Sequence, residues 1–245
     1  MRLALATLWI LIGSALTAGV YWLFLITPES TVWTLMASAL LALAALAVAG
    51  FTASGAIAMW SYGPSIGAIR RAMRAIPAAI PAAVMVWSMG WLAAHAQTWI
   101  AMRAGPINAW FIAQFGWDDV TWLFTTIGYM ILWFRWVPAA VLAFSLIAGV
   151  VTIGWSSLGQ GAWLRRALRP WTLALVTFWA IVLIGLPWTY LVPWRPRQLP
   201  ASSIEFAFIV AKLSISAIVL AAGAALIARD SISSADSASR YGGRP

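Results

Sequence analysis

Long uncharged runs, separated by short stretches of charged, proline and glycine residues, make up most of the chain. A helix needs about 20 apolar residues to cross roughly 30 Å of hydrocarbon, so each run is a candidate membrane span. Leu3–Thr27 is longer than the apolar part of a signal peptide and lacks a clear cleavage site, which predicts an uncleaved first helix. Trp33–Trp60 predicts the second, and Ser61–Ile69, with its Gly63-Pro64 pair, predicts a turn after it.

The next two runs differ in their polar content. Ile76–Thr98 begins with prolines in its first turns and predicts a third membrane helix. Trp99–Gly116 mixes aromatic residues with Arg103, Gly105-Pro106 and amide side chains. Such a mixture is typical of an interfacial or re-entrant segment, so we do not expect this stretch to span the membrane.

The stretch from about Val120 to Ser157 predicts either two crossings or one net crossing that includes a re-entrant or surface-lying piece. Val120–Phe134 is uncharged but short, and Arg135 and Pro138 stand between it and a further apolar run. The alternative of seven spans divides the stretch into two crossings, whereas six net crossings need it to cross once.

Two clearer runs end the apolar part of the chain. Trp171–Val192 and Ser203–Ala228 predict the last two spans, on either side of a loop rich in proline and arginine. The sequence therefore predicts an all-α, polytopic transmembrane helix bundle formed by residues 1–228 as a single domain. Residues 229–245 are polar and predict a disordered cytoplasmic tail.

Two similar arginine triplets decide the preferred topology. One precedes the third predicted helix and the other precedes the penultimate one: Arg70, Arg71 and Arg74, and Arg165, Arg166 and Arg169. Cytoplasmic loops carry an excess of basic residues. Six net crossings with both termini inside put both triplets in the cytoplasm, where we expect them to face anionic lipids, whereas seven spans give no charge bias.

Composition supports a membrane location and limits the available chemistry. Hydrophobic residues make up 63% of the 245 and charged residues 9%, too few to cover a soluble domain of this size. The net charge of +9 comes mainly from arginines that flank apolar runs, which favours lipid head groups over nucleic acid as partner. Arginine- and alanine-rich, lysine-poor usage suggests a GC-rich bacterial genome and hence a bacterial inner membrane. Most of the 18 tryptophans lie near predicted span ends, as in aromatic belts.

The sequence contains few residues that could carry catalysis. It has no cysteine, one histidine and six acidic residues, and it shows no phosphate-binding glycine loop, nucleophile elbow or metal-ligand box. We therefore expect a non-enzymatic protein without metal or cofactor. Membrane lipids are the expected partners, with partner membrane subunits or further copies of the chain as additional candidates.

Polar residues inside apolar runs are the candidate functional residues, because charges in hydrocarbon cost several kcal/mol, about 3 or more, unless they are paired or hydrated. Lys212, the only lysine, lies within the last apolar run, and Glu205 and Ser216 share its helix face. This stripe predicts either an anion, proton or Schiff-base site, or a lysine that extends to the interface and pairs with Glu205.

Three further residues are weaker candidates. Asp118 and Asp119 precede an apolar run, where they can cap a helix or act as counter-ions to Lys212 or Arg103. His95 lies four residues from both Trp91 and Trp99, which favours a polar anchor on an aromatic face over a ligand or proton relay.

One short string resembles a known family. Trp122-Leu123-Phe124-Thr125-Thr126, together with a single lysine in the final predicted helix, is similar to the microbial rhodopsins. The resemblance implies retinal bound to Lys212 and a light-driven pump. Thr121 and Phe208 stand where that family has carboxylates.

Three hypotheses for function follow. The first is a non-enzymatic inner-membrane protein, either a transporter-like bundle or a membrane subunit of a larger complex, with Lys212 as the best candidate residue. The irregular segments around Pro106 and Pro138 are typical of transporter cavities but also of buried interfaces. The second is a scaffolding subunit without ligand, and the third is the retinal protein that the resemblance implies.

Overall fold

The computed structural model of the chain describes residues 1–28, 30–116, 120–191, 193 and 202–241. The described residues form helices and no strand, which confirms the predicted all-α class. Five helical segments are long and apolar enough to cross a membrane, and Pro170–Gly185 is a shorter apolar helix. The five are Arg2–Ile26, Val32–Tyr62, Ile66–Phe115, Thr121–Thr152 and Ile204–Ile232. The protein is thus a membrane-embedded helical protein, and six net crossings stays a prediction.

The first two helices match the predicted spans closely. Helices α1 (Arg2–Ile26) and α2 (Val32–Tyr62) pack side by side, and Thr31 caps α2 through a reciprocal bond with Thr34. Small residues allow this close approach. A Cβ atom added at Gly55 would collide with the indole of Trp9.

The predicted turn over Ser61–Ile69 is wrong in its second half. Gly63 ends α2 with a φ of 73°, but α3 (Ile66–Ala75) already begins three residues later, where the Ser65 hydroxyl accepts a bond from Ala68 N–H. The reason is that a serine cap starts a helix as soon as the glycine has reversed the chain. A short 3₁₀ turn, Ile76–Ala78, links α3 to the next helix.

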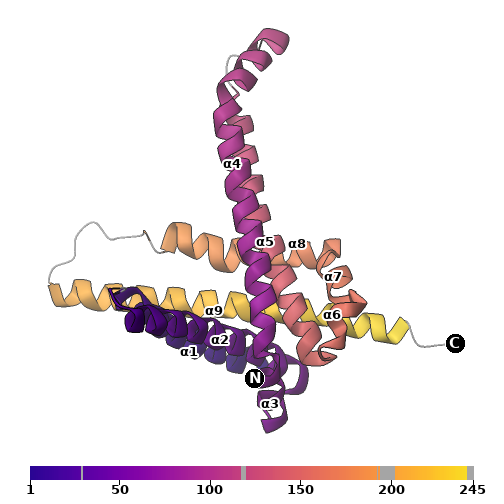
Figure 1. Cartoon of the computed structure of the whole chain (residues 1–245). Helices are drawn as coiled ribbons and strands as arrows, with labels where there is room; N and C mark the ends of the chain where they lie inside the picture. Colours follow the sequence, from indigo (N-terminus) through magenta and orange to yellow (C-terminus); the bar gives the residue numbers. More distant parts are fainter. Residues whose placement is uncertain (29, 117–119, 192, 194–201, 242–245) are drawn as a thin grey trace.

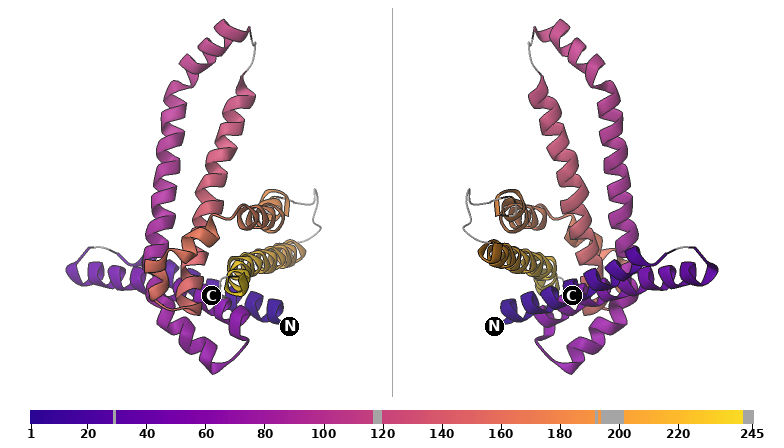
Figure 2. Two further views of the ribbon diagram at one scale, coloured as in Figure 1. Left: turned by 90° about the vertical axis from the view of Figure 1, so that its right-hand side faces the viewer. Right: turned by 90° about the vertical axis from the view of Figure 1, so that its left-hand side faces the viewer.

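The interfacial or re-entrant segment predicted for Trp99–Gly116 is instead a continuation of one long helix, α4 (Ala79–Phe115), which ends at Gly116 with a φ of 65°. Pro106 lies inside α4. Proline removes one backbone hydrogen bond, but the residue that loses its bond, Met102, is exposed, so the free carbonyl is not buried in protein. Figure 2 shows α4 bending in the last turns before Phe115, as a helix with an internal proline does.

Arg135 and Pro138 do not interrupt the stretch that follows. Helix α5 (Thr121–Thr152) is continuous through both and is the most buried of the five long helices. A single helix fits one crossing, as the preferred topology needs, and the seven-span division of this stretch is not observed.

The last third of the chain begins with short helices. They are α6 (Ser156–Gln160), α7 (Ala162–Ala167) and α8 (Pro170–Trp179), and α8 continues as the π-helical segments η2 (Ala180–Gly185) and η3 (Pro187–Leu191). Pro170 occupies the first turn of α8, where its missing N–H costs nothing.

Helix α9 (Ser202–Tyr241) completes the fold. Its residues Asp230 and Ser231 are buried, so packing continues beyond the boundary that the sequence places at residue 228. The sequence predicts a disordered tail from residue 229, whereas α9 remains helical to Tyr241. The docking of Asp230, described below, explains why the helix does not stop at Ala228.

Two regions are distinguished by their surroundings. Figure 1 shows α4 and the first half of α5 standing upright, crosswise to α8, α9 and the α1–α2 pair. We call residues 86–115 of α4 and residues 121–136 of α5 the arm. The body consists of the other described helices together with residues 79–85 of α4 and residues 137–152 of α5. The largest core cluster joins alanines of α2 and α3 to the lower part of α5, around Ile57, Ile147 and Val151.

Candidate functional site

Two residues of the predicted stripe on α9 have contacts within that helix. Lys212 Nζ lies 5.8 Å from the ring centroid of Phe208, one turn earlier. The Ser216 hydroxyl is buried, but it donates to the Lys212 carbonyl at 2.9 Å, a bond within the helix. Ser216 therefore uses its donor on the backbone rather than on a ligand beside the lysine.

His95 lies on an aromatic face of α4, as the spacing predicts. Its ring centroid is 3.9 Å from that of Trp91, and its Nδ1 lies 3.0 Å from the Trp91 carbonyl oxygen. One turn further along, the Arg103 guanidinium lies 4.3 Å from the ring centroid of Trp99. These four side chains form a row of aromatic and basic groups on the arm.

Only one of the three acidic candidates lies among the described residues. Asp118 and Asp119 lie outside the described residues, so their predicted roles as helix caps or counter-ions stay predictions. Glu205 lies in the first turn of α9.

The two arginine triplets have different settings despite their similar sequence. Arg70, Arg71 and Arg74 are all exposed on the ten-residue helix α3. Arg165 and Arg166 belong to the six-residue helix α7, and Arg169 is the N-cap residue of α8. The neighbouring Ala167 is buried in a cluster with Val137, Val141, Val176 and Ile227. The second triplet is thus divided between α7 and the start of α8, whereas the first lies on one helix.

The rhodopsin-like string and the lysine lie in different regions. Trp122 is the second residue of α5, at the far end of the arm, whereas Lys212 belongs to α9 in the body. The resemblance implies that the string and the lysine line one retinal pocket, and the structure does not bring them together.

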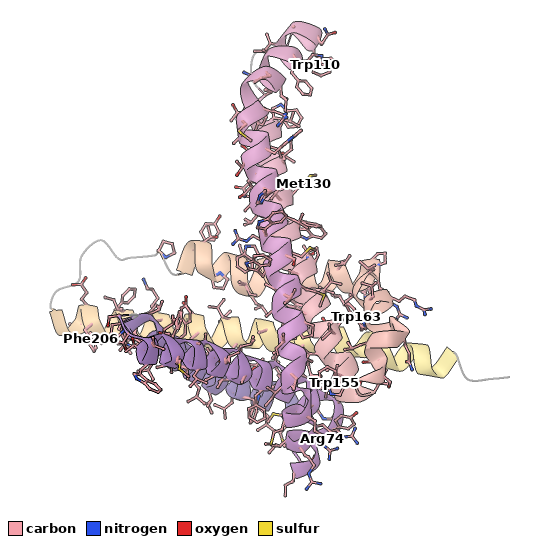
Figure 3. The ribbon with its side chains drawn as sticks, in the orientation of Figure 1. Arg74, Trp110, Met130, Trp155, Trp163 and Phe206 are labelled. Atoms are coloured by element: carbon pink, nitrogen blue, oxygen red, sulfur yellow. The ribbon has the colours of Figure 1, made fainter. Side chains whose placement is uncertain are left out.

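The arm presents apolar side chains along both of its helices. Figure 3 shows Met130 and Trp110 along the upright pair, well away from the body. Many large side chains there are exposed, among them Trp87, Trp99, Met102, Trp110, Tyr129 and Met130. The arm is joined to the body at its base, where Trp133 Nε1 donates to Thr177 Oγ1 at 2.9 Å.

The far end of the arm is aromatic. The rings of Trp110, Phe111 and Phe115 form a cluster with centroid distances of 5.0, 5.7 and 5.7 Å. Edge-to-face pairs of this kind are favourable contacts and hold the end of α4 in a defined shape. An aromatic cluster on a projecting helix pair is typical of a surface that meets an interface or another protein.

The cavities of the body are apolar. One of about 900 Å³ lies between α1 and α9, with Ile10, Leu11 and Leu220 among its lining residues, and one of about 440 Å³ adjoins it near Tyr21 and Phe144. Lys212, Glu205 and His95 line neither cavity. The described residues also contain no group of three or more metal-ligating side chains.

A polar cluster that the sequence does not predict lies where α8 meets α9. Asp230 is 4% exposed, its Oδ2 accepts a bond from Trp179 Nε1 at 2.9 Å, and its Oδ1 lies 2.8 Å from Arg229 Nε. The carboxylate was assigned to the polar tail, because the sequence gives no sign that a tryptophan 51 positions earlier reaches it.

Two other tryptophans connect helices of the body. Trp9 Nε1 donates to the Thr52 carbonyl at 3.1 Å, and Trp60 Nε1 donates to the Ala225 carbonyl at 3.0 Å. These bonds connect α1 to α2 and α2 to α9. The indole groups of the body therefore have a structural role that the predicted belts did not include.

Comparisons with known proteins add no relative. No family model matches the chain, and neither a curated protein nor a solved structure is similar to it at the level required for a match.

Proposed function

We propose that the protein is a non-enzymatic membrane subunit of a larger assembly in a bacterial inner membrane, and that the arm packs against apolar helices of a partner subunit. The observation that carries the proposal is the arm itself, a helix pair that stands apart from the body and exposes apolar and aromatic side chains over most of its length. In a membrane protein such a surface faces either lipid or a partner subunit, and the basic groups of the arm favour the partner.

The basic groups of the arm favour protein over lipid as its neighbour. His95, Arg103 and Arg135 are exposed among the apolar side chains. A charged group in hydrocarbon costs about 3 kcal/mol or more unless it is paired, and lipid tails provide no hydrogen-bond partner. Helices of a partner subunit can supply acceptors for these donors and cover the surrounding tryptophans.

The cavities support a subunit over a transporter for polar substrates. The transporter hypothesis relies on a polar group in a cavity, with Lys212 as the best candidate, but the two cavities beside α1 are lined mainly by apolar side chains and exclude Lys212. The scarcity of acidic residues and the absence of cysteine support a non-enzymatic role.

Site-specific photo-crosslinking in the native membrane tests the proposal. A photoreactive residue replaces Tyr129, which is 68% exposed on the arm, and a matched control replaces Trp33, which is 79% exposed at the start of α2. We expect the Tyr129 probe to give one discrete protein adduct, which mass spectrometry identifies as a different chain. The Trp33 probe should not give that adduct.

Two arm substitutions provide the second measurement. Trp99→Ala with Arg103→Gln should lower the amount of co-purified partner at least severalfold while the protein still inserts. Adducts with lipid alone would overturn the proposal, and adducts only with a second copy of the chain would replace the partner subunit by a homo-oligomer.

A further inference from the structure

Helix α3 is short, and three kinds of residue occupy three different sides of it. Alanines occupy the side that packs on the body, and Ala68, Ala72 and Ala75 are all buried. At 100° per residue, an arginine side and a side with larger apolar residues cover the rest of the helix. The arginine side holds Arg70, Arg71 and Arg74, and the apolar side holds Ile66, Ile69 and Met73.

The apolar side of α3 is exposed although its residues favour burial. Ile66 is 81% exposed, and Ile69 and Met73 are also open. Together with Arg70 and Arg74 these three residues line a shallow depression of about 470 Å³. Apolar groups beside guanidinium groups match a phospholipid, in which acyl chains lie directly below a phosphate.

The charge of this helix is not neutralised by the protein. Within the part of the chain that the structure describes, none of Arg70, Arg71 and Arg74 has a carboxylate within 4.0 Å, and Arg71 lies instead 4.1 Å from the ring centroid of Tyr62. Figure 3 shows Arg74 at the lower end of the molecule, pointing away from the other helices. The three donors are therefore directed outward.

From this geometry we propose that α3 is an in-plane anchor that binds anionic phospholipid: Ile66, Ile69 and Met73 enter the acyl region, and the three arginines bind head-group phosphates. Tyr62, an aromatic residue at the end of an apolar helix, marks the interface level at which α3 begins. The second arginine triplet lacks this arrangement, because α7 has only six residues and the third arginine, Arg169, is the N-cap residue of α8. The proposal does not depend on the function of the arm.

Spin labels at single cysteines test the anchor, because the chain has no cysteine of its own. The full protein carries a nitroxide at Met73→Cys, or at Gly67→Cys as a control on the arginine side of the same helix. Each variant is placed in nanodiscs of phosphatidylcholine alone or with an equal part of phosphatidylglycerol. Power saturation then measures accessibility to oxygen, which partitions into lipid, and to a water-soluble nickel chelate.

We expect the label at residue 73 to become accessible to oxygen and protected from nickel in the anionic discs, while the label at residue 67 stays accessible to nickel. Each arginine is expected to contribute about a fivefold preference for an anionic surface. Arg70→Gln with Arg71→Gln and Arg74→Gln should therefore reduce the preference of the inserted state for anionic discs about a hundredfold. Arg165→Gln is the matched control and should leave that preference nearly unchanged.

Three outcomes would overturn the anchor. Equal accessibility of the labels at residues 73 and 67 excludes an inserted apolar side. Equal insertion in both lipids excludes recognition of anionic head groups. Loss of insertion on addition of inorganic phosphate or oligonucleotide shows that the arginines bind soluble anions rather than the bilayer.

Discussion

The body and the arm are built from the same kinds of residue but pack differently. In the body, small residues bring helices into contact, and indole N–H groups of Trp9 and Trp60 donate to carbonyls of neighbouring helices. In the arm, a Cβ atom added at Gly105 or Gly128 would have no neighbour within 4 Å. Gly13, Gly50 and Gly55 in the body are thus contact positions, whereas Gly105 and Gly128 in the arm are open ones.

Apolar composition alone does not define a packed region. Both regions have the composition of membrane helices, and in both many large apolar side chains are exposed within this chain. What distinguishes the body is close contact between its helices at small residues, as dense packing in folded proteins requires. Substitutions that add atoms at contact positions and at open positions should therefore change the stability of the protein by different amounts.

The largest effect is expected at Gly55 in the body. Gly55→Ala places a Cβ atom on the indole of Trp9, which must move and then weakens its bond to the Thr52 carbonyl. Overpacking of this kind costs about 1–3 kcal/mol, so the melting temperature of the detergent-solubilised protein should fall by several degrees. An unchanged melting temperature would show that α1 and α2 are less tightly packed than described.

A second effect is expected at the buried carboxylate. Asp230→Ala removes the acceptor of the Trp179 indole N–H and should destabilise the α8–α9 contact by about 1–3 kcal/mol. Hydrogen exchange should then increase in α8 and the end of α9 but not in the arm. Asp230→Asn, which keeps an acceptor, should recover part of the loss; equal losses in both variants would argue against the role of this bond.

The smallest effect is expected in the arm. Gly128→Ala adds a methyl group in open space and improves helix propensity, so it should stabilise the isolated protein by at most about 1 kcal/mol. The same melting assay as for Gly55→Ala gives a matched comparison. Destabilisation by Gly128→Ala would mean that the arm packs as closely as the body.

The sequence predicts the apolar helices well because a membrane span needs only length and hydropathy. The first two helices agree with their predicted runs within a few residues. In the middle of the chain, proline is a poorer guide to helix ends. Pro106 and Pro138 predict interruptions, but both lie inside helices, since long flanking helices tolerate one missing backbone bond.

Long-range contacts explain what the sequence did not predict. The row of Trp91, His95, Trp99 and Arg103 follows from helical spacing and was anticipated in part. The pairing of Trp179 with Asp230 depends on how α8 lies against α9, which no local pattern encodes. The crosswise arm likewise depends on packing at its base, and its orientation became visible only in the assembled fold.

The length of α4 has a mechanical consequence. At 1.5 Å per residue its 37 residues extend about 55 Å, nearly twice the roughly 30 Å of bilayer hydrocarbon. An arm that crosses a bilayer therefore extends beyond it. It works as a spacer that holds the aromatic cluster at the end of α4 at a fixed distance from the membrane. Deleting one helical turn from both α4 and α5 would lower that end by about 5.4 Å, so the reach of the spacer can be set in steps of one turn.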